Sequence, residues 1–147
     1  MTDYALLCRQ LEQVTAGIPH RVANLANAAA LLWEALPRIN WAGFYCLEAG
    51  ELILGPFQGK VACVKIPVGR GVCGTAAAEN ATQVVPDVHA FPGHIACDSA
   101  SASEIVIPLR RDGAVWGVLD IDSPEPGRFT DADRAGLEAF AAIAEKL

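Results

Sequence analysis

The feature that most limits the folds open to this chain is a pair of strand-like runs near its C-terminus. Residues 104–109 and 115–121 are rich in β-branched and other apolar side chains, and Asp112-Gly113 lies between them. An Asp-Gly pair between two such runs is typical of a tight hairpin, whose turn needs backbone with positive φ. The sequence therefore predicts two neighbouring antiparallel strands here.

Further strand patterns precede this hairpin. Residues 41–47 are rich in aromatic side chains, and residues 51–54 follow them after a turn at 48–50, which predicts a second hairpin. Residues 61–68 and 83–85 also have strand-like composition, although Pro67 weakens the first of these runs.

Helical patterns lie on both sides of the strands. We expect a first helix capped by Thr2 and broken at 17–19, and a second helix that ends before Pro37. Thr130 and Asp133 have the spacing of a capping box for a closing helix. Strands grouped between helices favour the α+β class with an antiparallel sheet over a parallel βαβ arrangement.

The composition limits the functions that the chain can have. Its 147 residues fit one domain, which we expect to span 1–147. The net charge of -6 disfavours binding to nucleic acid, because phosphate contacts need a basic surface. We expect a cytoplasmic protein without a membrane segment, because no apolar run approaches the roughly 20 residues that span a bilayer and the N-terminus lacks a signal pattern.

The chain has five cysteines, namely Cys8, Cys46, Cys63, Cys73 and Cys97. An odd number without any CxxC pair argues against a disulfide framework and against a zinc ribbon, so we expect reduced thiols. Cys8 and Cys46 fall within a helix and a strand, where a cysteine packs as a small hydrophobe. The other three fall in loops or at element ends, and Cys97 lies in the long polar loop 86–103, so these three are the candidates for chemistry.

Three acidic residues belong to the C-terminal hairpin. Asp120 and Asp122 flank Ile121 in an apolar run, so strand alternation puts both carboxyl groups on one face of the sheet, and Glu104 begins the partner strand. Two acids close together repel, so at least one should keep its proton to unusually high pH. The alternative is a hairpin end whose acids are simply solvated.

Thiols beside protonated acids suggest the reduction of a sulfoxide. A thiolate attacks the sulfur, an acid protonates the departing oxygen, and the resulting sulfenic acid condenses with a second thiol. Cys97 is the candidate nucleophile. Trp41 and Tyr45 fall on one face of their strand, where an indole can pack on an S-methyl group, although packing in the core is the more frequent fate of such a tryptophan.

Two other motifs are weaker. Residues 69–74 read GRGVCG and fit GxGxxG, but a dinucleotide site also requires a βαβ unit and an acid about 20 residues later. We interpret these glycines as a tight turn into a short helix, or as backbone that approaches a small anion such as a carboxylate. His89, His94 and Cys97 lack a second cysteine pair, so we predict no metal site and no bound cofactor.

Longer motifs then identify a family. NWAGFY, ELILGPFQGKVAC, GRGVCGTAA, VVPDV, PGHIACDS, SEIVIPL and GVLDIDS occur in the order found in the free methionine-(R)-sulfoxide reductases, from Asn40 to about Phe129. The chain resembles this family along most of its length. The resemblance implies a single GAF domain, with a central antiparallel sheet of about six strands and helices packed on one side.

The resemblance also implies roles for particular residues. Cys97 corresponds to the nucleophile, and Cys63 and Cys73 correspond to resolving cysteines. Glu104, Asp120, Asp122 and Trp41 correspond to residues that line the family's pocket. The family uses thioredoxin as external reductant, and its members are commonly homodimers.

We therefore expect an enzyme that reduces free L-methionine (R)-S-oxide to L-methionine through a sulfenic acid and an intramolecular disulfide. Glu104, Asp120 and Asp122 would supply the proton and hold the substrate ammonium, with Trp41 and Tyr45 beside them. The alternative is a GAF-type sensory module that binds a small molecule or reports oxidant without catalysis. The sequence does not decide which of Cys63 and Cys73 resolves first.

Overall fold

The computed structural model describes residues 1–95 and 99–147. Within these residues the chain forms four α-helices, one short 3-10 helix and six strands. In chain order the elements are α1 (Tyr4–Thr15), α2 (Arg21–Ala35), β1 (Trp41–Glu48), β2 (Glu51–Gly59), β3 (Lys65–Pro67), α3 (Gly71–Glu79), β4 (Gln83–Val85), η1 (Val88–Ala90), β5 (Ser103–Arg111), β6 (Ala114–Ser123) and α4 (Asp131–Ala144).

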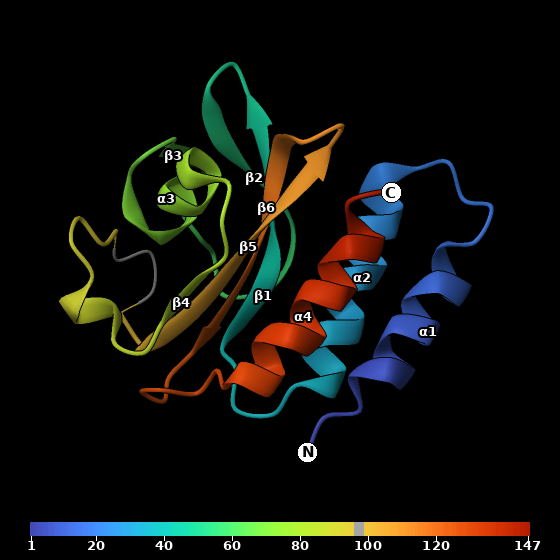
Figure 1. Ribbon diagram of the computed structural model, residues 1–147, viewed down its shortest axis with the longest axis horizontal. Helices are drawn as coiled ribbons and strands as arrows, with labels where there is room; N and C mark the ends of the chain where they lie inside the picture. The colour runs from blue at the N-terminus through green and yellow to red at the C-terminus, as the bar shows by residue number, and fades with distance from the viewer. Residues whose placement is uncertain (96–98) are drawn as a thin grey trace.

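The six strands form one sheet in the order β3-β2-β1-β6-β5-β4, and every neighbouring pair is antiparallel (Figure 1). The predicted α+β class and the antiparallel sheet of six strands are therefore confirmed. The hairpin of β5 and β6 turns at Asp112 and Gly113, whose φ values are 53° and 81°. Both residues have the positive φ that the Asp-Gly signal predicts.

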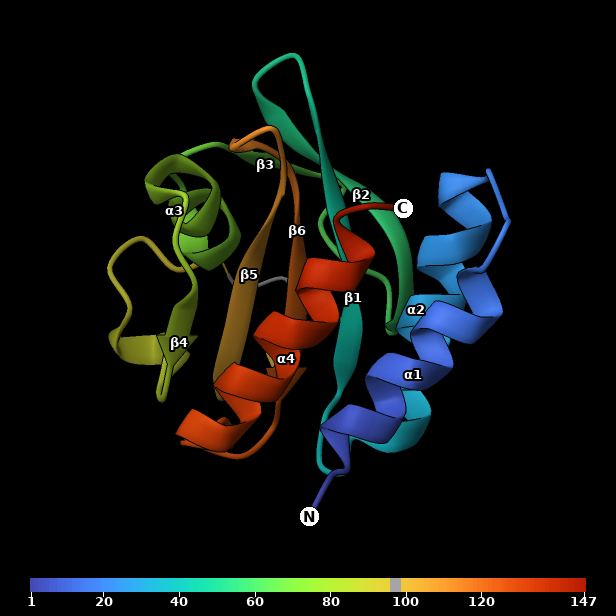
Figure 2. The ribbon, with the colours of Figure 1, turned by 45° about the vertical axis from the view of Figure 1, so that its right-hand side comes forward.

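Of the three long helices, α2 and α4 pack directly on one face of the sheet and α1 packs on these two helices, while α3 lies on the opposite face (Figures 1 and 2). Alternate residues of each strand point to the helix side, as Ile105, Ile107 and Leu109 of β5 do. The predicted packing of helices on one side thus holds for the long helices. The short α3 instead packs with Val106 and Val118 in a second apolar cluster on the other face.

The helix ends follow the capping chemistry of the sequence, with one correction. α4 has the predicted capping box, since Thr130 Oγ1 accepts a hydrogen bond from the Asp133 amide and the Asp133 carboxylate accepts one from the Thr130 amide. α1 is capped by Asp3, whose Oδ1 accepts a hydrogen bond from the Leu6 amide at 3.0 Å, and not by Thr2. The carboxylate lies one residue closer to the first helical turn.

Two strand boundaries also differ from the prediction. β2 extends to Gly59 because it pairs with the whole of β1, as far as Trp41 opposite Gly59. The strand predicted at 61–68 shortens to Lys65–Pro67. Residues 60–64 cross the end of the sheet without regular structure, and side chains of β1 hold some of their carbonyl groups.

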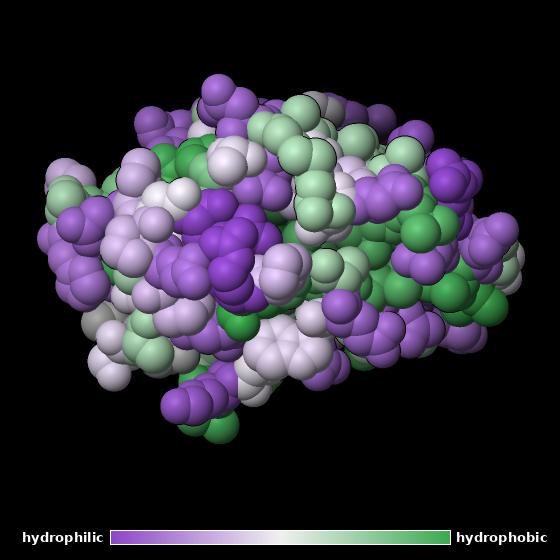
Figure 3. All heavy atoms as spheres, turned by 90° about the horizontal axis from the view of Figure 1, so that it is seen from below, coloured by the Kyte–Doolittle hydropathy of each residue, from purple (hydrophilic) through white to green (hydrophobic). Residues whose placement is uncertain are grey.

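The surface also differs between the two sides of the molecule. Seen from below, hydrophilic side chains crowd the side of β4, and hydrophobic atoms show on the side of the long helices (Figure 3). Large hydrophobic side chains exposed on α1 and α2 are Leu6, Val14, Val22 and Trp33. Of the helices in the described part of the chain, none combines the length and the hydrophobicity needed to cross a membrane.

Candidate active site

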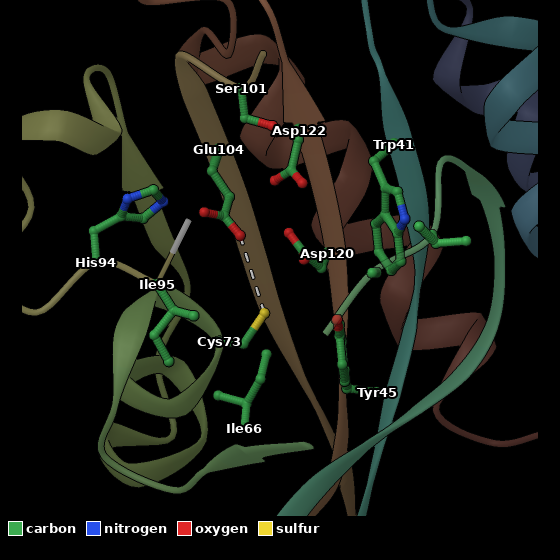
Figure 4. A pocket seen from close by; sticks show the side chains of 12 residues that line it. Trp41, Tyr45, Ile66, Cys73, His94, Ile95, Ser101, Glu104, Asp120 and Asp122 are labelled. Carbon is green, nitrogen blue, oxygen red and sulfur yellow. Dashed lines mark hydrogen bonds between the residues drawn. The ribbon is translucent and has the colours of Figure 1, made fainter. Parts of the chain in front are cut away.

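A pocket lies on the face of the sheet opposite the long helices, between β1, β5 and β6 on one side and α3 with its neighbouring loops on the other (Figure 4). Its empty space, including the opening to solvent, is about 510 Å³. Side chains from all these segments line it, namely Trp41, Tyr45, Val61, Ala62, Ile66, Cys73, His94, Ile95, Ser101, Glu104, Asp120 and Asp122.

The three predicted acids meet in this pocket because of strand register. Glu104 on β5 lies opposite Asp122 on β6, and Asp122 in turn lies opposite Trp41 on β1. Asp120 is two residues from Asp122 and shares its face of the sheet. The prediction that the carboxyl groups of Asp120 and Asp122 share one face is therefore confirmed, and the idea of acids solvated at a hairpin end does not hold for Glu104 and Asp120, which are 8% and 5% exposed.

Burial gives these acids unusual protonation. Burial, followed by the charges of Asp120 and Asp122, raises the pKa of Glu104 well above its ordinary value. Burial also raises the pKa of Asp120, although hydrogen bonds with the neighbouring Glu104 and Asp122 carboxyls act in the opposite direction. The raised pKa favours the protonated form of Glu104, which is the form that general acid catalysis requires.

One buried oxygen in this cluster is left for a ligand. Oδ1 of Asp120 has no hydrogen-bond partner among the residues that the structure describes. A buried polar atom in a native protein is normally satisfied. Because the atom faces the pocket (Figure 4), a bound cationic or hydrogen-bond-donating group would complete its coordination.

The candidate thiols occupy different positions. The Cys73 thiol lies at the start of α3, is 3% exposed, and donates to Glu104 Oε2 over 4.0 Å. Burial and then the charges of Asp120 and Glu104 raise its pKa well above the ordinary value, so it is a neutral thiol. Cys63 is disulfide-bonded, which corrects the expectation of reduced thiols throughout. Cys97, the predicted nucleophile, lies outside the described residues.

Cys8 and Cys46 lie away from the pocket. Both are free, half-buried thiols that pack against the core beneath the long helices. Burial raises the pKa of each of them. This placement agrees with the structural role predicted for them, because a buried neutral thiol is unreactive.

Two aromatic residues form one wall of the pocket. The Trp41 ring stacks between Tyr45 and Phe57, with centroids 5.8 Å and 5.1 Å away. Trp41 Nε1 donates to the Lys60 carbonyl at 3.2 Å, and the Tyr45 hydroxyl donates to the Cys63 carbonyl at 2.9 Å. Both predictions for this pair, pocket lining and core packing, hold together, because their rings are buried yet form the wall.

The glycine motif at 69–74 is a tight turn. A side chain at Gly74 would place its Cβ 2.5 Å from the Pro67 carbonyl oxygen, and Gly69 and Gly71 have φ values of 91° and 63°. Since all strand pairs of the sheet are antiparallel, the βαβ unit of a dinucleotide site does not occur around this turn. A Cβ on Gly71 would meet Ile95 at 3.2 Å, so hydrocarbon covers the start of α3.

Ser101 and Ile95 line the pocket without having been predicted from the sequence. Ser101 is buried and accepts a hydrogen bond from the Asn40 amide at 3.2 Å. His94 lines the pocket as well, whereas the sequence suggested it only as a metal ligand that we rejected. Burial and then His89 lower the pKa of His94, which makes it neutral at pH 7. The signal that could have found these residues is the long polar loop, which packs over the sheet.

The structure brings together a set of possible metal ligands that differs from the histidines and cysteine considered in the sequence analysis. Cys73, Glu104 and Asp120 each place one donor atom within 4.8 Å of the others. The raised pKa values of Glu104 and Cys73 favour their protonated forms, and a cation would have to displace those protons. This cluster therefore suits a proton or an organic ammonium group better than a metal ion.

Comparison with known proteins agrees with this geometry. The GAF domain family matches residues 10–146. The free methionine-R-sulfoxide reductase of Escherichia coli (strain K12) is 59% identical over 144 residues, which cover 98% of this chain and 87% of that protein. The structure of fRMsr of Staphylococcus aureus in complex with substrate superposes with a TM-score of 0.94 at 55% identity, over 99% of this chain and 95% of that one.

A further solved structure is equally similar. The free methionine-R-sulfoxide reductase from Neisseria meningitidis, in complex with its substrate, has a TM-score of 0.94 at 50% identity, over 97% of this chain and 86% of that one. Similarity at this level extends along almost the whole chain, including the strands that carry the acids. The chain therefore belongs to the GAF domain family and, within it, to the free methionine-R-sulfoxide reductases.

Proposed function

We propose that this protein reduces free L-methionine (R)-S-oxide to L-methionine. The observation that carries the proposal is the convergence of Glu104, Asp120 and Asp122 in a pocket that also holds the Cys73 thiol and the Trp41 indole (Figure 4). A pocket rich in buried carboxyl groups suits a small zwitterion with an ammonium group. Relatives named for this reaction supply the substrate's identity.

The substrate's two ends find separate partners in the pocket. The ammonium group binds the carboxyls of Asp120 and Asp122, where the unsatisfied Oδ1 of Asp120 accepts one of its protons. The S-methyl group packs on the Trp41 ring, because sulfur and its neighbours contact aromatic faces favourably. The positive charge of the bound ammonium also reduces the repulsion among the acidic residues. A methionine whose amino group is in a peptide bond lacks this charge, so the site favours the free amino acid.

The reaction proceeds in two steps, the formation of a sulfenic acid and the formation of a disulfide. The Cys97 thiol attacks the sulfoxide sulfur and takes its oxygen, so that Cys97 becomes a sulfenic acid and the substrate leaves as methionine. Glu104 protonates the oxygen as it leaves sulfur and recovers a proton from the thiol. A second thiol then condenses with the sulfenic acid, which forms a disulfide and releases water.

We propose that Cys63, and not Cys73, is the first resolving cysteine. Cys63 is disulfide-bonded, while Cys73 is a free thiol that is almost fully buried beside Glu104. A neutral buried thiol attacks slowly, because the thiolate is the nucleophile. In the first turnover Cys73 therefore stays a thiol beside the acidic residues, and Cys63 forms the disulfide.

A thiol protein must reopen the disulfide, and we propose thioredoxin in this role in a cytoplasmic setting without any bound cofactor. We also propose a homodimer. The hydrophobic side chains exposed on α1 and α2, among them Val22 at 73% and Trp33 at 39%, support a contact between copies on the helix side. Such a contact leaves the pocket open, since it lies on the opposite face of the sheet.

A coupled assay tests the function. The protein with thioredoxin, thioredoxin reductase and NADPH should consume NADPH when free methionine-(R)-sulfoxide is added, and dithiothreitol should replace the thioredoxin system. Cys97→Ser should abolish turnover with either reductant, because it removes the nucleophile.

The matched control is Cys46→Ser, which alters a thiol on the helix side and should keep wild-type turnover. Full activity of Cys97→Ser would refute the role of this cysteine. Absence of turnover in the wild type with both reductants, together with tight binding of a cyclic nucleotide, would favour a sensory GAF module instead.

A further inference from the structure

The segment 60–64 carries Cys63 and has no regular secondary structure. It links β2 to β3 along the rim of the pocket, and its side chains Val61 and Val64 are 88% and 63% exposed. Ala62 and Cys63 are half-buried and pack against the apolar cluster on this face of the sheet. Packing by these two small side chains is limited, so hydrogen bonds to the backbone also hold Cys63 in place.

Three hydrogen bonds hold that backbone. The Leu54 amide of β2 donates to the Val64 carbonyl at 2.9 Å, as in an ordinary strand pair. The other two come from side chains of β1, since Trp41 Nε1 donates to the Lys60 carbonyl and the Tyr45 hydroxyl donates to the Cys63 carbonyl at 2.9 Å. The bond from Tyr45 is the one that acts on the cysteine itself.

Tyr45 is well suited to hold this position. Its ring is 2% exposed and stacks on Trp41, so the hydroxyl has one fixed location. Burial and then Asp120 raise the pKa of Tyr45, so the hydroxyl stays neutral and remains a donor. A tyrosine hydroxyl has a single proton to donate, and here the Cys63 carbonyl accepts it.

We propose that Tyr45 is a positioning residue for the resolving step, which it serves by fixing the backbone of Cys63 through its hydroxyl. This inference rests on the proposed function, in which the disulfide of Cys63 is a catalytic intermediate. The hydrogen bond from Tyr45 to the Cys63 carbonyl does not depend on the substrate. Tyr45 places the sulfur of Cys63 where a disulfide forms. The step that this bond serves is the condensation of the Cys63 thiol with the sulfenic acid.

Tyr45→Phe isolates the hydroxyl, because phenylalanine keeps the ring and its stacking. The chain also offers a matched control in Tyr4→Phe. Tyr4 is the other tyrosine, and its hydroxyl donates to Asp133 at 2.6 Å on the helix side of the sheet. Each variant loses one internal hydrogen bond. A difference between the two variants therefore reflects where the lost bond lies in the structure, because the number of lost bonds is the same.

The first measurement is the equilibrium between the dithiol and disulfide forms of the protein in buffers of reduced and oxidised dithiothreitol. Tyr45→Phe should lower the equilibrium constant for the disulfide by about 2- to 10-fold, the effect of one hydrogen bond, while Tyr4→Phe should leave it unchanged. Trp41→Phe, which removes the bond to Lys60, should shift it in the same direction. Equal constants for Tyr45→Phe and wild type, or an equal shift in Tyr4→Phe, would overturn the proposal.

The second measurement is a single turnover of the reduced protein with free methionine-(R)-sulfoxide. Timed from the formation of methionine, the sulfenic acid, trapped with dimedone, should persist about 2- to 10-fold longer in Tyr45→Phe than in the wild type. A slower first step with a normal second step would contradict the positioning role. Failure of every variant to form methionine would count against the proposed function alone, because the dithiothreitol equilibrium needs no substrate.

Discussion

Glu104 shows how one side chain acquires its chemistry from its surroundings. It is an ordinary residue in a strand, but β5 directs it into the pocket, where Asp120, Asp122 and the Cys73 thiol surround it. Water is largely excluded from the carboxyl, which is why the charged form is unfavourable and the pKa is high. The burial that makes Glu104 a proton donor also means that its carboxyl group lowers the stability of the folded protein at high pH.

That cost can be measured with Glu104→Gln. The raised pKa means that the carboxyl contributes no penalty below its ordinary value of 4.5, where it is protonated in both the folded and the unfolded chain. As the pH rises above 4.5, the unfolded chain releases this proton while the folded chain keeps it, so the wild type loses stability. Urea unfolding should therefore show equal stability of the two proteins near pH 4.5 and a more stable Glu104→Gln variant at pH 8.

The same variant should be a poor enzyme. Glutamine cannot donate a proton to the departing oxygen, so kcat should fall about 100-fold or more. Glu48→Gln, at an exposed position on β1, is the control for both experiments and should change neither activity nor the pH dependence of stability. A Glu104→Gln variant that is less stable than wild type at pH 8 would mean that the carboxyl is ionised in the folded protein.

At the scale of elements, the register of three strands builds the site. Trp41, Asp122 and Glu104 lie side by side on β1, β6 and β5, and Asp120 lies opposite Val106 on the same face. A slip of one residue would turn every one of these side chains toward the long helices. The apolar residues between them, such as Ile121 and Ile105, prevent that slip because they are fully buried on the helix side.

The start of α3 is equally constrained, because it places Cys73 beside Glu104. Gly74→Ala would bring a Cβ within 2.5 Å of the Pro67 carbonyl oxygen, which is backbone and cannot rotate away. The helix must then move, and unfolding in urea should show a loss of about 1–3 kcal/mol. The control Ala78→Ser alters an exposed position of the same helix and should cost less than about 0.5 kcal/mol. A Gly74→Ala protein of wild-type stability would show that the turn is not tightly packed.

At the scale of the whole molecule, a buried ion pair joins segments that are distant in sequence. Arg128 lies 3.0 Å from Asp133 of α4 and donates to the Pro37 carbonyl at 3.1 Å, while Tyr4 of α1 donates to the same Asp133. The side chains of the pair are 4% and 13% exposed. The network ties the first helix, the α2–β1 connection and the last helix together on the side away from the pocket.

Arg128→Ala should therefore destabilise the fold without altering the chemistry. Removal of one partner leaves a buried carboxylate uncompensated, which costs about 3–5 kcal/mol, while kcat at a temperature where the variant is folded should stay near the wild-type value. Arg134→Ala removes an exposed pair with Glu138 on the same helix and should cost less than about 1 kcal/mol. Equal losses in the two variants would show that burial adds nothing to the pair around Arg128.

Much of the fold could be predicted from local sequence signals. The turn at Asp112-Gly113, the capping box of Thr130 and Asp133, and the strand at Gln83–Val85 agree with the structure, because each depends on the conformational preferences of neighbouring residues. The shared face of Asp120 and Asp122 is equally local, since strand alternation fixes it. The role of Cys97 remains a prediction from the sequence and its family resemblance.

Other features depend on residues that are far apart in the chain. The sequence does not show that β1 pairs with β6, some 70 residues later, that Cys73 reaches Glu104, or that Tyr45 holds the carbonyl of Cys63. It also suggested a strand where residues 61–64 have none, because the carbonyl groups of Cys63 and Val64 accept hydrogen bonds from the Tyr45 hydroxyl and the Leu54 amide, which are distant in the sequence. Local sequence preferences thus determined the helices, the strands and the residue types of the site. The pairing of distant strands decided which of these side chains meet, because their burial, their protonation and the distances between them depend on contacts in the folded chain.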